Sequence, residues 1–179
     1  MHHETQRSNR NDAHNYIESL YNKGLRCFLV EMHYQVPSAF QDACFIKVPN
    51  TLTALQQIAA YHRQQFSLPV IAITGSNGKT STKDLAAIVM AKKLQTRATF
   101  GNLNNHIGLP LTLLSLRDGD QCCVTEMGMN HPGEIAQLAQ AALAQVALVN
   151  NAQREHQEFM QSGAAVAEEN GAAIKALAA

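Results

Sequence analysis

The stretch VIAITGSNGKT, residues 70–80, decides the fold. Its first four residues form a continuous apolar run, which is typical of a parallel strand that is covered on both faces. A glycine-rich turn follows at once, and residues 80–94 then place apolar side chains at helical spacing. A strand, a glycine-rich turn and a helix in this order predict the phosphate-binding loop of a parallel α/β domain.

The chemistry of this loop depends on its backbone and on two side chains. Glycines let backbone N–H groups approach phosphate oxygens, and the start of the next helix adds partial positive charge. Lys79 would supply a cation for the β- and γ-phosphates, and the Thr80 hydroxyl would bind Mg²⁺. A strand-to-helix turn without a ligand is the alternative. The nucleotide-binding residues that we expect are Thr74, Gly75, Ser76, Asn77, Gly78, Lys79, Thr80 and Ser81.

The regions around the loop follow a strand–helix alternation. We expect strands at residues 122–125 and 146–149, with a helix from Pro132, as its first residue, to about Leu143 between them. Alternating strands and helices imply a parallel α/β sheet. Upstream, the pattern indicates a helix at 14–23, strands at 26–30 and 44–48, and a further helix capped by Thr51. We expect two partial domains, residues 1–67 and 68–179.

Composition excludes several classes of protein. The 179 residues are 46% hydrophobic and carry 14 basic and 14 acidic side chains, so no charge excess indicates binding to nucleic acid or to an anionic membrane. No leader or membrane-spanning run is evident, and we expect a cytoplasmic protein. Cys27, Cys44, Cys122 and Cys123 show neither zinc-site nor disulfide-framework spacing, which favours reduced thiols.

Three sequence blocks together resemble the Mur ligases. They are TGSNGKTST at 74–82, GNLNNHIGLPLTLL at 101–114 and EMGMNHPGEI at 126–135, and the resemblance is close over residues 69–160. Residues 11–17 also resemble an element of the family's amino-terminal domain. The resemblance implies a parallel-sheet ATPase domain, incomplete at its end, preceded by part of a small α/β domain that binds a uridine nucleotide.

The activity that this resemblance implies is ATP-dependent amide synthesis in peptidoglycan precursor formation. The substrate carboxylate attacks the γ-phosphate, and an amine then displaces phosphate from the acyl phosphate. The matching member of the family joins D-alanyl-D-alanine to UDP-N-acetylmuramoyl-tripeptide, so these two molecules are the expected partners. ATP and Mg²⁺ are the expected cofactors, and a monomer is the expected state.

The resemblance also assigns site residues. It implies Lys79, Glu126 and His156 as catalytic residues, Thr80, Glu126 and His156 as metal ligands, and Asn104 and Asn105 as substrate-binding residues. From the residues alone, Glu126 and His156 could be solvated side chains, and turn formation could explain the asparagines. Many Mur ligases have a lysine that becomes carbamylated where this chain has Asn170, so we expect no carbamate here.

Three alternatives remain at this stage. A folylpolyglutamate-type ligase has a similar phosphate loop, although the blocks at 101–114 and 126–135 favour the peptidoglycan enzyme. A nucleotide-binding module without catalysis is an alternative of a different class. The first 66 residues resemble one subgroup of the family and the run NAQREH at 151–156 resembles another, so a chimeric, designed or fragmentary gene is a further alternative.

Overall fold

A computed structural model describes residues 12–129, 131–153 and 162–177 of the chain. The chain forms two compact units that divide between Ala54 and Leu55, inside helix α3 (Thr51–Gln64). Most of α3 packs with the second unit, since Ala59 lies in that unit's core and the Arg63 guanidinium bonds to the Ala142 carbonyl at 2.8 Å. The domain boundary predicted from the sequence, between residues 67 and 68, lies after this helix.

The first unit is a small α/β unit with a two-stranded sheet. It contains the 3-10 helix η1 (Ala13–Tyr16), α2 (Ile17–Asn22), β1 (Cys27–Glu31), the 3-10 helix η2 (Ser38–Phe40) and β2 (Cys44–Val48). The two strands are parallel, and their core-facing side chains pack against Ile17 and Phe40. The strand expected at 44–48 is confirmed, the one expected at 26–30 begins one residue later, and the helix expected at 14–23 is divided into η1 and α2.

The second unit is built on a four-stranded parallel sheet. Its order is β4 (Thr96–Ala98), β5 (Cys122–Glu126), β3 (Val70–Thr74) and β6 (Val146–Val149). The three strands predicted from apolar runs are present. Short β4 was missed because Thr96-Arg97-Ala98 has no apolar run. The predicted phosphate loop leaves β3, one of the two inner strands, with the carboxyl end of β5 beside it.

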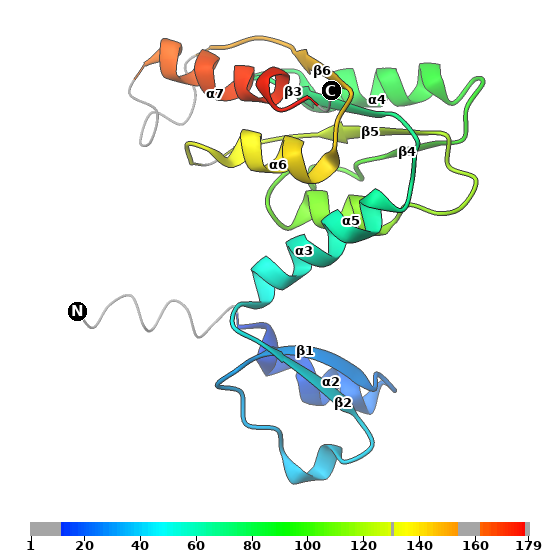
Figure 1. The fold of residues 1–179 in the computed structure, drawn as a ribbon, viewed down its shortest axis with the longest axis vertical. Helices are drawn as coiled ribbons and strands as arrows, with labels where there is room; N and C mark the ends of the chain where they lie inside the picture. Colours follow the sequence, from blue (N-terminus) through cyan, green and yellow to red (C-terminus); the bar gives the residue numbers. More distant parts are fainter. Residues whose placement is uncertain (1–11, 130, 154–161, 178–179) are drawn as a thin grey trace. The chain divides into compact units, whose positions relative to one another are not determined.

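Helices cover both faces of this sheet, which confirms the expected α/β class. Helix α4 (Lys79–Met90) packs on one face, over Ile73, Cys122 and Val124. Helices α5 (Gly108–Leu114), α6 (Glu134–Ala142) and α7 (Gly163–Lys175) lie on the other face, where the larger core is formed. Figure 1 shows α4 on one side of the sheet and α5 and α6 on the other.

Three helix ends differ from the expected ones. The cap of α3 is Asn50, whose Oδ1 accepts the Thr53 N–H at 2.8 Å, while Thr51 is the first helical residue. Helix α4 ends at Met90, four residues before the end of the predicted range. Helix α6 starts after Gly133, which has a left-handed φ of 89°, so Pro132 lies before the helix and not at its first position.

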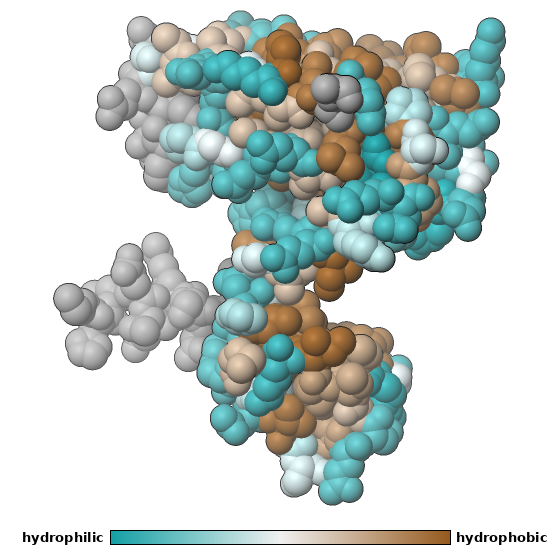
Figure 2. Space-filling view, viewed as in Figure 1, coloured by the Kyte–Doolittle hydropathy of each residue, from teal (hydrophilic) through white to brown (hydrophobic). Residues whose placement is uncertain are grey.

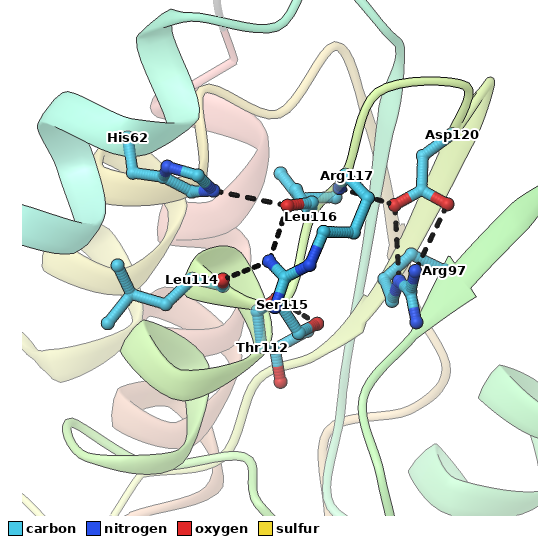
Figure 3. A network of polar contacts seen from close by, with 8 residues as sticks. All are labelled: His62, Arg97, Thr112, Leu114, Ser115, Leu116, Arg117 and Asp120. Atoms are coloured by element: carbon cyan, nitrogen blue, oxygen red, sulfur yellow. Dashed lines mark hydrogen bonds and ion pairs between the residues drawn. The ribbon is translucent and has the colours of Figure 1, made fainter.

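A polar network fixes the connection from α5 to β5, as Figure 3 shows. Buried Asp120 accepts bonds from Nε and Nη2 of Arg97 at 3.2 and 3.3 Å and from the Arg117 N–H at 2.9 Å. The Arg117 side chain in turn bonds to the carbonyls of Leu114 and Leu116. The connection enters β5 at Cys122, whereas the phosphate loop adjoins the other end of the sheet, so this network is structural.

On the face drawn in Figure 2, apolar surface gathers on part of the first unit and is also present on the second. Its exposed large apolar side chains include Leu25, Met32, Val36 and Ile46. In the second unit, Leu85, Ile88 and Val89 are exposed on the face of α4 that points away from the sheet. None of the helices in the described ranges is both long and apolar enough to cross a membrane.

Candidate nucleotide-binding site

The loop after β3 has a positive φ, which favours glycine, at two positions. Gly75 has φ 131° and Gly78 has φ 77°. A Cβ on Gly75 would lie 2.9 Å from the Asn151 backbone nitrogen, and one on Gly78 would lie 2.7 Å from Asn150 Nδ2. Conformation and the nearby backbone together require glycine at position 75, and the left-handed backbone favours glycine at position 78.

The amino terminus of α4 faces this loop without a side-chain cap. Gly78 is the N-cap residue and makes no side-chain bond to the first turn. The first N–H groups of a helix have no acceptor within the helix, and the helix dipole makes this end attractive to an anion. Lys79 adds a full positive charge, and its Nζ donates to the carbonyls of Gly75 at 2.5 Å and Ser76 at 3.3 Å.

The segment after β6 holds the loop from the other side. The Ser76 N–H donates to the Asn151 carbonyl at 3.1 Å, and the Asn77 N–H donates to Asn151 Oδ1 at 2.9 Å. The Gln153 N–H also donates to Ser76 Oγ at 2.8 Å. Two loop amides therefore have protein acceptors, so the first turn of α4 is where we expect backbone amides to bind an anion. The sequence analysis did not predict these contacts of Asn151 and Gln153 with the loop.

Glu126 lies at the same edge of the sheet as the loop. It ends β5 in register with Ile73 of β3, on the face that α4 covers. The side chain is 1% exposed, and Oε1 accepts a hydrogen bond from Asn104 Nδ2 at 2.7 Å. Oε2 is also buried and has no hydrogen-bond partner among the described residues. A buried carboxylate oxygen without a partner is costly, so a cationic ligand would stabilise it.

The oxygen groups at this edge fit a hard cation such as Mg²⁺, which prefers carboxylate, hydroxyl and phosphate oxygens. Thr80 is exposed in the first turn of α4, and Glu126 supplies the unpaired carboxylate oxygen. The described ranges contain no cluster of three or more His, Cys, Asp or Glu residues that could hold a metal alone. A metal bound by Thr80 and Glu126 would need further ligands, and phosphate oxygens are of the kind that Mg²⁺ prefers. His156 lies outside the described residues.

The two predicted substrate-binding asparagines have different local roles. Asn104 reaches Glu126 past Gly128, where an added Cβ would come within 2.9 Å of Asn104 Nδ2. Asn105 Oδ1 accepts the N–H groups of Ile107 at 3.1 Å and Gly108 at 2.9 Å, and so organises the entry to α5. Their substrate contacts remain a prediction.

Asn170 of α7 contacts the base of the loop on the other face of the sheet. Its Oδ1 accepts the Thr74 hydroxyl at 2.6 Å, and its Nδ2 donates to the Val166 carbonyl at 3.0 Å. The side chain is 1% exposed, so these bonds satisfy it in the interior. The neighbouring Glu169 carboxylate accepts the N–H groups of Gly133 and Ile135, which caps α6.

Lys83 is a second cation on α4 that the sequence analysis missed. It lies one turn after Lys79 on the sheet-facing side of the helix, and its side chain is 3% exposed. Its Nζ bonds to Oδ1 of Asp84 at 2.5 Å. The i, i+4 spacing from Lys79 was the signal that could have indicated it, because residues four apart share one helix face.

Comparison with known proteins identifies a matching family model, the Mur ligase middle domain, over residues 73–178. The UDP-N-acetylmuramoyl-tripeptide–D-alanyl-D-alanine ligase of Bacillus subtilis is 38% identical over 159 residues, which cover 89% of this chain and 34% of that protein. The ligase of the same name from Escherichia coli is 38% identical over 162 residues, covering 90% of this chain and 35% of that protein.

Comparison with solved structures also finds members of the Mur ligase family. MurF from Acinetobacter baumannii superposes with a TM-score of 0.86 at 32% identity, covering 94% of this chain and 36% of that one. MurF ligase from Thermotoga maritima, solved in complex with ADP, superposes with a TM-score of 0.83 at 29% identity, covering 94% of this chain and 38% of that one. The chain thus spans about a third of the length of the relatives it matches.

Proposed function

The chain belongs to the Mur ligase family, and on that premise we propose that it carries the nucleotide-binding part of an ATP-dependent ligase. The proposed overall reaction joins D-alanyl-D-alanine to UDP-N-acetylmuramoyl-tripeptide in peptidoglycan precursor synthesis. Its substrates are those in the names of the relatives, and the ADP complex of the Thermotoga maritima enzyme supports ATP as the nucleotide.

The single observation that carries the proposal is the arrangement at the carboxyl edge of β3 and β5. An uncapped helix amino terminus and the Lys79 ammonium lie at the loop that follows β3. Glu126, with one unpaired buried oxygen, ends the neighbouring strand. Ligands of open α/β sheets bind at this edge, and the combination of positive charge and a carboxylate suits a metal-bound triphosphate.

The protein's own groups would act mainly by positioning and charge neutralisation. The first-turn amides of α4 and Lys79 would hold the β- and γ-phosphates while the substrate carboxylate attacks the γ-phosphorus. Thr80 and Glu126 would hold Mg²⁺, with His156 as a further proposed ligand. When bound, Mg²⁺ would neutralise charge on the phosphate oxygens. Asn104 orients the Glu126 carboxylate by its bond to Oε1.

The reaction is tested by measuring inorganic phosphate release from Mg·ATP. The chain should be assayed with UDP-N-acetylmuramoyl-tripeptide and D-alanyl-D-alanine together, with each alone, and with folate plus glutamate. Release that requires the tripeptide substrate supports the proposal, and release driven by folate would overturn it. Saturable Mg·ATP binding without turnover would restrict this chain to the nucleotide-binding role.

A further inference from the structure

We propose that Cys27 and Cys44 form a reversible disulfide when a low-molecular-weight disulfide such as oxidised glutathione is present. The two residues are direct partners in the register of the parallel strands β1 and β2. Register partners project their side chains to the same face of a sheet. Neighbouring strands lie about 4.8 Å apart, and this spacing falls within the roughly 4.4–6.8 Å between the Cα atoms of natural disulfides.

Access separates this pair from the other two cysteines. Cys27 and Cys44 are exposed free thiols, whereas Cys122 and Cys123 are buried in β5. Burial, reinforced by the neighbouring Cys122, raises the pKa of Cys123 to about 12. The thiolate is the form that attacks a disulfide, and an oxidant must also reach it. Only the pair in the first unit meets the requirement for access.

Contacts beside the cysteines hold the two strand starts together. The Cys44 N–H donates to the Arg26 carbonyl at 2.7 Å, and Arg26 Nε donates to Asp42 Oδ2 at 2.7 Å. Asp42 also accepts a hydrogen bond from the Tyr21 hydroxyl, and the Arg26 guanidinium lies 4.2 Å from the centre of the Tyr21 ring. Arg26 and Asp42 therefore brace the two strands at the end where the thiols lie, just before Cys27 and Cys44.

The chemistry is a pair of thiol–disulfide exchanges. One cysteine thiolate attacks the glutathione disulfide, forms a mixed disulfide and releases one glutathione thiolate. The second cysteine thiolate then attacks the protein sulfur of that mixed disulfide and releases the second glutathione. The two protein thiols lose two electrons and two protons in total, and the oxidant is reduced to two thiols. The product ties β1 to β2 at their first residues.

The test uses the full chain under native conditions in glutathione buffers of graded ratio. Samples are quenched with an alkylating reagent and analysed by intact mass and peptide mapping. We expect the loss of two hydrogen atoms and one cross-linked peptide pair that contains Cys27 and Cys44. Cys27→Ser and Cys44→Ser should each retain one glutathione, because neither has a second thiol to displace it. Cys122→Ala should behave as the wild type.

A further variant tests the bracing contacts. Asp42→Asn removes the ionic partner of Arg26 and should lower the equilibrium constant of disulfide formation by roughly two- to fivefold, the range expected for an exposed ion pair. Two glutathiones on one wild-type chain, a disulfide between two chains, no reaction of the exposed thiols, or a bond involving Cys122 or Cys123 would each overturn the proposal.

Discussion

Asn104 donates a hydrogen bond of 2.7 Å to Oε1 of Glu126, while Oε2 of the same buried carboxylate has no partner in the described part of the chain. The Asn104 amide thus fixes the orientation of the carboxylate and supplies a hydrogen-bond donor to one of its two oxygens. The other oxygen, Oε2, lies at the carboxyl end of β5, beside the predicted phosphate loop. A side chain in this state is better suited to binding a cation than to stabilising the fold.

Glu126→Gln separates these two roles. The substitution removes a buried charge and keeps the side-chain shape, so the free energy of unfolding without metal should stay within about 1 kcal/mol or increase. Mg²⁺-dependent ATP binding should weaken at least about tenfold, because the proposed metal ligand loses its charge. Glu168→Gln, at an exposed position of α7, is the matched control and should change neither quantity.

Unfolding with and without Mg·ATP, monitored by circular dichroism, measures both effects. A variant that is strongly destabilised without ligand but binds Mg·ATP normally would assign Glu126 a structural role instead.

The contact between Thr74 and Asn170 should stabilise the base of the loop. Asn170→Ala leaves the buried Thr74 hydroxyl without its acceptor, and the expected loss of unfolding free energy is about 1–3 kcal/mol. Combined with Thr74→Val in a double-mutant cycle, it should show a coupling energy of about 1 kcal/mol in chemical denaturation. Asn102→Ala, at an exposed position, serves as control. Additive effects of the two substitutions would mean that the hydrogen bond contributes nothing.

Arg63 is a buried cation held by carbonyls. Its guanidinium donates to the carbonyls of Phe66, Leu68, Ala142 and Leu143, and burial lowers its pKa. Arg63→Met should reduce the unfolding free energy by about 2–4 kcal/mol, since several buried carbonyls lose their donors at once. The loss should be within about 0.5 kcal/mol for Lys92→Met at an exposed site. Equal stability of the two variants in urea titrations would contradict this interpretation.

Burial of Cys123 predicts a pH dependence of stability. Its pKa is raised from 9.0 to about 12 in the folded chain, so the folded state keeps a proton that the unfolded state loses. The thiol's contribution to stability is complete below about pH 9 and is lost as the pH rises toward 12. Cys123→Ala should therefore show a smaller decrease in unfolding free energy over this range than the wild type. Parallel curves for the two proteins would show that the thiol does not cause the decrease.

The sequence predicts those parts of the site that depend on neighbouring residues. The loop at 74–80 was found because a strand, two glycines and a helix start are contiguous. Contacts between distant segments were not found: Asn104 with Glu126, Asn151 with Ser76 and Asn77, and Asn170 with Thr74 all depend on how the strands are ordered. Short β4 lacks an apolar run, and the relation of Cys27 to Cys44 is fixed only by the register of β1 and β2.

Titration of Mg·ATP into the folded chain by calorimetry tests the central claim most directly. Lys79→Ala is compared with the exposed-site control Lys92→Ala at equal concentration, with folding verified by circular dichroism. We predict saturable binding to the wild type and the control, and at least about tenfold weaker binding to Lys79→Ala, which lacks the cation at the phosphate loop. A folded wild type that does not bind Mg·ATP, or equal binding by all three proteins, would contradict the assignment of this loop.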